Sequence, residues 1–427
     1  MQELLQYIKE SDKPLIADGA MGTMLIKYGL QTGQCPEEIN ISNPGMLERI
    51  HREYRKAGAI ILQTNTFGAN RIKLESYGLA DKVEKVVGEG VKIAKEVAGD
   101  DAFVGLSVGP TGKLMKPYGT LSFNDLYEVF IEQIAAGVQA GADCICIETM
   151  GDMGELKAAY LAAREFNLPI SCAVSFESGG RTLMGTGPDV YARTVSNWGS
   201  DIIGTNCISP ESLLKIFEKI INNCTGPVYI RPNAGEPILK GNETLYPMTA
   251  EDFASFGSKF TEKGAKILGG CCGTMPEHVS LLEKTLENEK IKSIGKDNRK
   301  WLTSAVDSVE ITNNLKSSLV NIRNYVNKDF IETQKVANAL GEIQISDSGI
   351  IVMDFSEISC NNVAETIEFV QATVRTPLAF KVNSVEILKR ALRPYKGIAG
   401  VIAPDLNQSD VSEVLEAYGG EIIDNLQ

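Results

Sequence analysis

The sequence of 427 residues predicts an α/β protein: a (β/α)8 TIM barrel over residues 1–285, followed by a smaller α/β half-barrel-like domain over residues 301–427. Two observations support this fold class. Eight short, almost continuously apolar runs lie between residues 15 and 272, as expected of parallel strands buried on both faces. The segments between them repeat apolar residues at intervals of three and four, which is typical of amphipathic helices. Eight regular units in about 260 residues fit a closed barrel better than a doubly wound open sheet.

The eight predicted strands follow one another in order along this first region. They are LIADGAM (15–21), AIILQTNTF (59–67), AFVGLSVGP (102–110), DCICIETM (143–150), PISCAVSF (169–176), DIIGTNC (201–207), PVYIRPN (227–233) and AKILGGCC (265–272). In a (β/α)8 barrel the carboxyl ends of all strands lie on one face, where active sites are found. Residues that end these runs are therefore the first candidates for function.

The regular pattern stops after residue 285. Residues 286–300 are charged and weakly apolar, which predicts a linker. Four further strands are expected beyond it, with helical patterns between them, at 317–322, 349–355, 377–382 and 397–404. Four units make a half-barrel or a small open sheet and leave two unpaired sheet edges. We therefore expect this region to dock against its own barrel, a second copy of the chain or a partner protein.

Composition narrows the class of protein. With Lys+Arg 42 against Asp+Glu 55 the formal net charge is −13, so binding to nucleic acid or to an anionic membrane surface is not expected. No run of about 18 apolar residues and no secretory signal is found, which predicts a cytoplasmic protein. Nine cysteines cannot all pair, so reduced thiols or metal thiolates are expected. His51, His278 and Trp301 are expected at surface or capping positions.

Three of the cysteines end predicted strands. Cys207 closes the sixth run, and Cys271 and Cys272 close the eighth, so their thiols are expected to converge at the barrel mouth. Thiolates suit Zn²⁺, and three protein ligands leave a fourth position open, as in catalytic sites. The alternatives are core packing for Cys207 and a strained disulfide between the adjacent pair. Three other cysteines within strands are expected only to pack: Cys144, Cys146 and Cys172.

The charge of such a site indicates its chemistry. Zinc with three thiolates has a formal charge of −1 and is a weak Lewis acid, but it holds a further sulfur as a thiolate that stays nucleophilic. No histidine or glutamate base lies beside these cysteines in the sequence, so hydrolysis by zinc-bound water is disfavoured. The residues therefore favour alkylation of a substrate thiol.

Seven segments within residues 10–285 carry a family resemblance. They are DGAMGTML (18–25), QTNTFGAN (63–70), VGPTGKL (108–114), IETMGD (147–152), GTNC (204–207), RPNAGEP (231–237) and GGCCGT (269–274). Together they resemble the homocysteine-binding barrel of cobalamin-dependent methionine synthase, in the wider family of zinc homocysteine S-methyltransferases. GGCCGT with an upstream NC is the most specific of these signals.

The resemblance implies a metal site at the strand ends. Cys207, Cys271 and Cys272 would ligate zinc, and Asn233 would supply an oxygen ligand that the substrate sulfur displaces. A turn position is the alternative role for Asn233.

The resemblance also implies an amino-acid site beside the metal. Asp18 and Glu148 would hold the ammonium group of L-homocysteine through charge-assisted hydrogen bonds. Backbone N–H groups would receive its carboxylate, from Gly19, Ala20, Met21, Gly22 and Thr23. A helix cap for Asp18 and a salt bridge for Glu148 are the alternatives.

Residues 301–427 resemble the first half of the folate-binding barrel that follows in the cobalamin-dependent synthases. WLTSAVDSVEI looks like the connecting segment, and PLAFKVNSVEILKRALRPYKG is similar to the stretch around the third strand. LVNIRN stands where that family has Gly-Glu-Arg-x-Asn. We interpret the region as a degenerate, partial pterin-binding-like domain that does not bind methyltetrahydrofolate.

The resemblance implies an enzyme that methylates homocysteine to methionine, with zinc in the barrel and a corrinoid only on a separate partner protein. Three alternatives stay open: S-methylmethionine or another sulfonium as the donor, a different thiol acceptor, and a non-catalytic scaffold that docks a corrinoid protein. A homo-oligomer formed through the C-terminal domain is a further alternative for its unpaired sheet edges.

Overall fold

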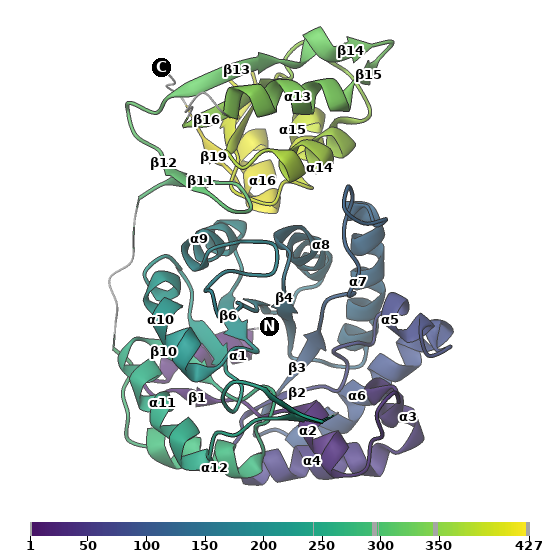
Figure 1. Cartoon of the computed structure of the whole chain (residues 1–427), viewed down its shortest axis with the longest axis vertical. Coiled ribbons are helices and arrows are strands. Elements are labelled where there is room, and N and C mark those ends of the chain that lie inside the picture. The colour runs from purple at the N-terminus through teal and green to yellow at the C-terminus, as the bar shows by residue number, and fades with distance from the viewer. Residues whose placement is uncertain (1, 242, 293–296, 298, 345–348, 424–427) are drawn as a thin grey trace.

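The computed structural model describes residues 2–241, 243–292, 297, 299–344 and 349–423. The predicted linker, 286–300, includes residues 293–296 and 298, which lie outside the described residues. The chain folds into a large lower part and a smaller upper part, as Figure 1 shows.

Eight parallel strands form the central sheet of the large part, which confirms the predicted (β/α)8 barrel. Their order is β1-β10-β7-β6-β5-β4-β3-β2, and a bridge between Ala17 and Ile61 brings the two edges together. Each lies within one of the predicted runs: β1 (Leu15–Ile16), β2 (Ile61–Gln63), β3 (Phe103–Val108), β4 (Cys144–Met150), β5 (Ile170–Val174), β6 (Ile202–Asn206), β7 (Val228–Arg231) and β10 (Ala265–Leu268).

Helices surround this sheet on its outer face (Figure 1). The principal ones are α2 (Met21–Lys27), α4 (Pro44–Lys56), α6 (Val83–Ala98), α7 (Phe123–Gln139), α8 (Met153–Arg164), α9 (Pro188–Trp198), α10 (Pro210–Ile221), α11 (Ala250–Glu262) and α12 (Pro276–Leu286). A further helix, α1 (Gln2–Glu10), adds Leu4 and Ile8 to the cluster that fills the barrel interior. Cys144 and Cys146 lie in that same cluster, so packing accounts for both.

The expectation for His51 is wrong, because the side chain is fully buried rather than at the surface. Within α4 the buried residues are Leu47, Ile50, His51 and Tyr54, which are spaced as one face of a helix. The charged residues around His51 occupy the other faces. His278 does cap a helix, since its Nδ1 accepts a hydrogen bond from the backbone N–H of Met275 at 3.2 Å.

The small part contains a five-stranded parallel sheet in the order β13-β16-β17-β18-β19. Four strands match the predicted runs: β13 (Ser317–Asn321), β16 (Ile350–Asp354), β17 (Leu378–Lys381) and β18 (Gly400–Ile402). The fifth, β19 (Glu421–Ile422), is not predicted. The helices are α13 (Thr333–Gln344), α14 (Val363–Thr373), α15 (Val385–Leu392) and α16 (Gln408–Tyr418). A hairpin of β11 (Trp301–Thr303) and β12 (Ser308–Glu310) precedes the sheet.

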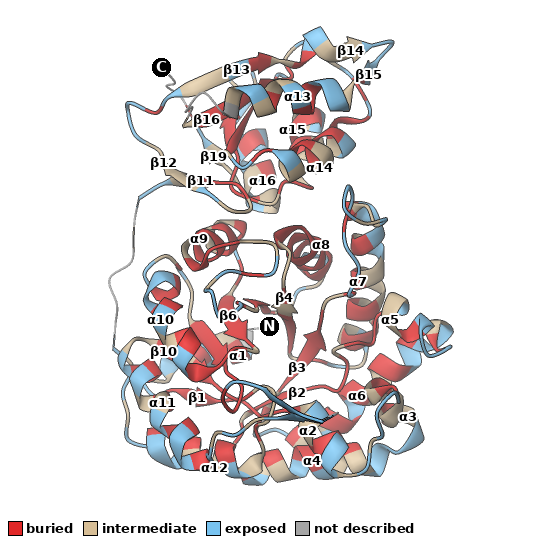
Figure 2. Cartoon of the chain, viewed as in Figure 1, coloured by how far each residue is buried: buried red, intermediate tan, exposed pale blue. Residues whose placement is uncertain are grey.

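The small part docks on helices α8 and α9 of its own barrel (Figure 1). Every residue of α8 except Arg164 is buried, and Figure 2 shows α8 and α9 in red beneath the upper part. Lys157 of α8 donates to the carbonyl oxygens of Leu392 at 2.9 Å and Tyr395 at 2.7 Å. The small part was expected to dock on its own barrel, on a second copy of the chain or on a partner protein. The structure shows it docked on its own barrel. Within the described residues, no helix is long and apolar enough to span a bilayer.

Candidate functional site

The three strand-end cysteines come together at the barrel mouth. Cys207 directly follows β6, while Cys271 and Cys272 lie in the turn after β10. Their sulfur atoms all lie within 4.8 Å of one another, and the Sγ atoms of Cys207 and Cys272 are 3.8 Å apart. All three thiols are free and partly exposed, so neither the core-packing nor the disulfide alternative describes them.

The glycines of the 269–274 turn make this convergence possible. A Cβ atom on Gly270 would lie 2.3 Å from Thr274 Oγ1, and one on Gly273 would lie 2.2 Å from the Cβ of Tyr246. Gly273 also has a φ of 81°, a left-handed conformation that favours glycine. The turn can therefore close tightly enough for two consecutive cysteines to face the same space as Cys207.

The three thiols of the cluster differ in how easily they ionise. Hydrogen bonds from Cys207 and Cys271 lower the pKa of the Cys272 thiol well below its usual range, and the hydroxyl of Tyr246 acts in the same direction. One sulfur of the cluster therefore ionises readily. A thiolate is the form of cysteine that binds metals and acts as a nucleophile.

Asn233 lies in a segment whose backbone is hydrogen-bonded to residues of the cysteine loops. It lies just beyond β7, where its N–H donates to the carbonyl of Ile208 at 2.9 Å and the next N–H, of Ala234, donates to the carbonyl of Cys272 at 2.9 Å. Its side-chain Oδ1 is buried and has no hydrogen-bond partner among the described residues. A buried acceptor without a donor is costly. Three sulfurs with this oxygen form a donor set that suits a tetrahedral zinc ion.

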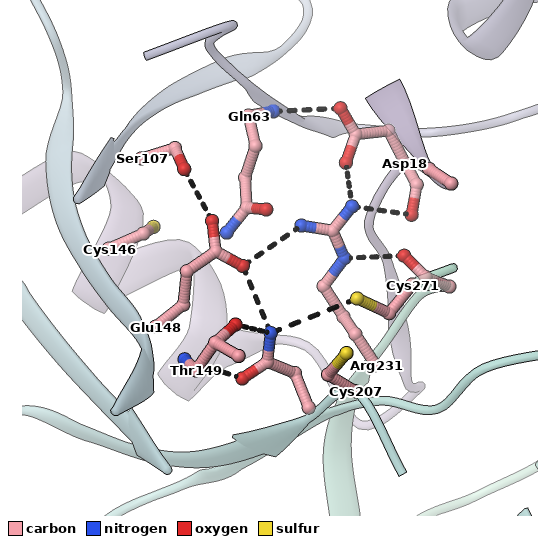
Figure 3. A network of polar contacts seen from close by, with 12 residues as sticks. Asp18, Gln63, Ser107, Cys146, Glu148, Thr149, Cys207, Arg231 and Cys271 are labelled. Carbon is pink, nitrogen blue, oxygen red and sulfur yellow. Dashed lines mark hydrogen bonds and ion pairs between the residues drawn. The ribbon is translucent and has the colours of Figure 1, made fainter. Parts of the chain in front are cut away.

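A buried ion-pair network lies next to the cluster (Figure 3). Arg231, at the end of β7, donates to Asp18 Oδ1 at 2.8 Å, and its Nη1 lies 3.9 Å from Glu148 Oε2. The same guanidinium donates to the carbonyl oxygens of Gly19 and Gly270, each at 2.8 Å. Arg231 therefore ties the strand ends that carry the carboxylates to the turn that carries two of the cysteines.

The two carboxyl groups lie in an environment of low polarity. Burial raises the pKa of Asp18 to about 7, although Arg231 and the backbone N–H of Gln63 oppose the shift. Burial likewise raises the pKa of Glu148 to about 7, again against the effect of Arg231. Two carboxylates and one guanidinium leave one negative charge unbalanced when both are ionised. A substrate ammonium group would complete this balance.

The glycine-rich segment lies at the entrance to α2. This helix begins at Met21, so the N–H groups of its first turn have no partner within the helix. Within the segment, the N–H of Ala20 donates to Thr274 Oγ1 at 3.1 Å, and Thr23 Oγ1 accepts from the N–H of Gly273 at 3.0 Å. The segment is therefore joined to the cysteine turn.

A single cavity of about 330 Å³ connects these groups. It is lined by every predicted site residue except Asn233, namely Asp18, Gly19, Ala20, Met21, Gly22, Thr23, Glu148, Cys207, Cys271 and Cys272. It is also lined by residues to which sequence reasoning gives no role, including Glu37, Gln63, Phe67, Ser107, Thr149 and Arg231. Arg231, Gln63 and Phe67 stand in quoted segments, and that is the only signal the sequence offers for them.

The fold and the cavity define a (β/α)8 barrel whose mouth places a cluster of three thiols beside two buried carboxyl groups. Residues 15–286 match the model of the family described as homocysteine S-methyltransferase. The chain therefore belongs to this family of methyltransferases, as the segment resemblance predicts.

Known relatives agree with this membership. The chain is 32% identical over 300 residues to a methionine synthase of Mycobacterium tuberculosis (strain ATCC 25618 / H37Rv), covering 66% of this chain and 25% of the relative. It is 32% identical over 297 residues to the methionine synthase of Mycobacterium leprae (strain TN), covering 65% and 24%. The alignments thus span about a quarter of the length of these relatives.

A solved structure shares the barrel. The metallated form of the homocysteine methyltransferase MmuM from Escherichia coli superposes with a TM-score of 0.56 at 22% identity, covering 65% of this chain and 98% of that chain. This likeness shows the fold.

Proposed function

We propose that this chain is a zinc-dependent homocysteine S-methyltransferase that forms methionine and takes the methyl group from a separate methylcorrinoid protein. The observation that carries the proposal is the convergence of three cysteine sulfurs within 4.8 Å of one another in a cavity that also holds two buried carboxyl groups. The first feature suits a metal-bound thiol, and the second suits an ammonium group.

Cys207, Cys271, Cys272 and Asn233 would hold the zinc ion. When bound, zinc would keep a substrate thiol as a nucleophilic thiolate at neutral pH. The buried Oδ1 of Asn233 supports its role as the weak, displaceable ligand, because it accepts no hydrogen bond from any residue that the structure describes.

The chain's other groups would bind and orient the amino acid. Asp18 and Glu148 would accept hydrogen bonds from the ammonium group, and backbone N–H groups between Gly19 and Thr23 would receive the carboxylate. Arg231 holds Asp18 in place and leaves one negative charge for the incoming cation. With the α-amino and carboxylate groups held here and the sulfur held at the metal site, the substrate is oriented toward the methyl donor, and such positioning is worth several kcal/mol of the barrier.

The rim of the barrel mouth supports a protein as the carrier of the methyl group. Leu114, Leu183 and Leu239 follow β3, β5 and β7 respectively, and their side chains are 49%, 72% and 79% exposed. Loops after the strands all lie on the mouth side of the barrel. A protein carrier that docks at this mouth would cover these exposed side chains, and a contiguous apolar patch is typical of such a docking surface.

We propose that the whole chain divides into three parts. These are the homocysteine-binding barrel, 1–285, a linker, 286–300, and a degenerate pterin-binding-like domain, 301–427. In this last domain the carboxylate of Asp354, at the end of β16, pairs with Lys381 Nζ at 2.9 Å, which supports the absence of a pterin site there. The edge strand β13 exposes Leu319, and a homo-oligomer formed through this domain would cover it.

One variant tests the site, and one assay tests the donor. We expect Cys272→Ala to lose metal binding and methyl transfer while keeping its fold, whereas Cys146→Ala, inside the barrel, keeps all three. Near-normal transfer by the Cys272 variant would refute the metal site.

The donor assay offers homocysteine with a methylated corrinoid protein, free methylcobalamin, methyltetrahydrofolate or S-methylmethionine. We expect transfer from the corrinoid protein. Transfer from S-methylmethionine alone would replace this donor with a sulfonium. If a metal-loaded protein transfers no methyl group to homocysteine, the assay is repeated with other thiols: transfer to one of them would favour a different acceptor, and none at all would favour a docking scaffold.

A further inference from the structure

The side chain of Asn206 occupies the space between the two halves of the site. Asn206 is the last residue of β6 and is fully buried. Its Nδ2 lies 2.7 Å from Thr149 Oγ1, 3.2 Å from Glu148 Oε2 and 3.9 Å from Cys271 Sγ. It is thus within reach of both the ammonium-binding carboxylate and the sulfur cluster.

The amide is oriented by Thr149. Its Oδ1 accepts the backbone N–H of Thr149 at 2.9 Å, while its Nδ2 bonds the hydroxyl of the same residue. This pair of contacts spans the end of β5, which lies between β4 and β6 in the sheet. Thr149 and Cys207, on either side of the bridge, have φ values of 59° and 61°. Such conformations are strained for residues with side chains and persist only where surrounding contacts impose them.

The two N–H groups of the Asn206 amide have three possible acceptors. A side-chain amide has two N–H groups, and Thr149 Oγ1 takes one of them. The other faces two acceptors, the oxygen of Glu148 and the more distant sulfur of Cys271. An ammonium group that bonds to Glu148 competes with Asn206 for that carboxylate. The sulfur of Cys271 is then the acceptor that remains for this N–H, and a hydrogen bond withdraws electron density from that sulfur.

We infer that Asn206 is a positioning residue that couples occupancy of the ammonium site to the electronic state of the Cys271 sulfur. The inference rests on the proposed function for the identity of both sites, and extends it to a residue that touches neither substrate sulfur nor metal. It predicts that the amino acid part of the substrate alters the metal site before any substrate sulfur arrives.

The test uses the full chain loaded with Co²⁺, whose sulfur-to-metal charge-transfer band reports on the cysteine ligands. The probe is L-2-aminobutyrate, which has the ammonium and carboxylate groups of homocysteine and no sulfur. We expect saturating 2-aminobutyrate to shift this band in the wild-type protein and to leave it unchanged in Asn206→Leu, a replacement of similar shape without N–H groups. Asn223→Leu, at the end of α10, is the control and keeps the shift.

A second measurement separates coupling from simple structural support. Because Asn206 competes with the ammonium group for Glu148, we expect 2-aminobutyrate to bind Asn206→Leu as tightly as the wild-type protein or up to about tenfold more tightly, whereas loss of structural support alone would weaken its binding. The band of the ligand-free protein should also move in Asn206→Leu, because Cys271 loses its N–H contact. Should this variant fail to fold, Thr149→Val removes the hydroxyl that orients the amide, and a reduced shift is expected.

Equal shifts in the wild-type protein and the variant, or no shift in a wild-type protein that binds 2-aminobutyrate, would overturn the inference alone. A wild-type protein that binds Co²⁺ without a sulfur charge-transfer band, or that does not bind the amino acid, would instead contradict the proposed function.

Discussion

Replacing Glu148 by glutamine removes one negative charge from the ammonium site with little change of shape. The carboxylate is buried, accepts hydrogen bonds from Ser107 Oγ and Asn206 Nδ2, and lies 3.9 Å from the guanidinium of Arg231. With Asp18 and Arg231 forming one ion pair, Glu148 supplies the charge that an ammonium group balances. A hydrogen bond to a charged group contributes about 1.5–3 kcal/mol. We therefore expect Glu148→Gln to weaken homocysteine binding by about ten- to a hundredfold.

The assay is calorimetric titration of the metal-loaded protein with homocysteine and with 4-mercaptobutyrate, the same thiol without its amino group. Binding of 4-mercaptobutyrate should change by less than about threefold, since it makes no contact that depends on the lost charge. Glu177→Gln, an exposed residue after β5, removes the same charge from the rim and should affect neither ligand. Equal loss of affinity for both thiols, or no loss for homocysteine, would refute the assignment of Glu148.

Two further predictions concern stability. Burial lowers the pKa of His51 to about 4 from 6.5, so below pH 6.5 the unfolded chain binds a proton that the folded chain does not. The free energy of unfolding should therefore fall by up to about 3 kcal/mol between pH 6.5 and 4. Chemical denaturation should show a smaller fall over this range in His51→Phe. If the free energy of unfolding had the same pH dependence in both proteins, the imidazole would not be buried and neutral. Lys157→Met leaves the carbonyls of Leu392 and Tyr395 without their donor, which should lower the free energy of unfolding by about 1–3 kcal/mol for each carbonyl. Hydrogen exchange at the end of α15 should become faster, while metal binding stays unchanged. Unaltered exchange there would show that this lysine does not hold the small part in place.

The strands of the barrel could be predicted because burial on both faces leaves continuous apolar runs in the sequence. The convergence of Cys207 with Cys271 and Cys272 follows from the rule that strand ends share one face of the barrel. By contrast, β19 has two residues and β8 (Ile238–Lys240) has three exposed ones, so neither produces an apolar run.

The polar network of the site could not be predicted in the same way. Arg231 reads in sequence as one more charge at a strand end, and only the closed barrel places it between Asp18 and Glu148. His51 could have been placed correctly from the sequence, because it shares the helical spacing of Leu47, Ile50 and Tyr54, which form the buried face. The expectation failed because it was based on the charged residues next to His51, which occupy the other faces of the helix.

X-ray absorption at the zinc edge, on protein with one bound zinc and with or without homocysteine, identifies the atoms that bind the metal. We expect three sulfur neighbours and one lighter atom in the free protein, and four sulfur neighbours once homocysteine binds. In Asn233→Ala the lighter neighbour should become water, with the three sulfurs retained. A zinc ion with fewer than three sulfur neighbours, or one whose surroundings homocysteine leaves unchanged, would contradict the account.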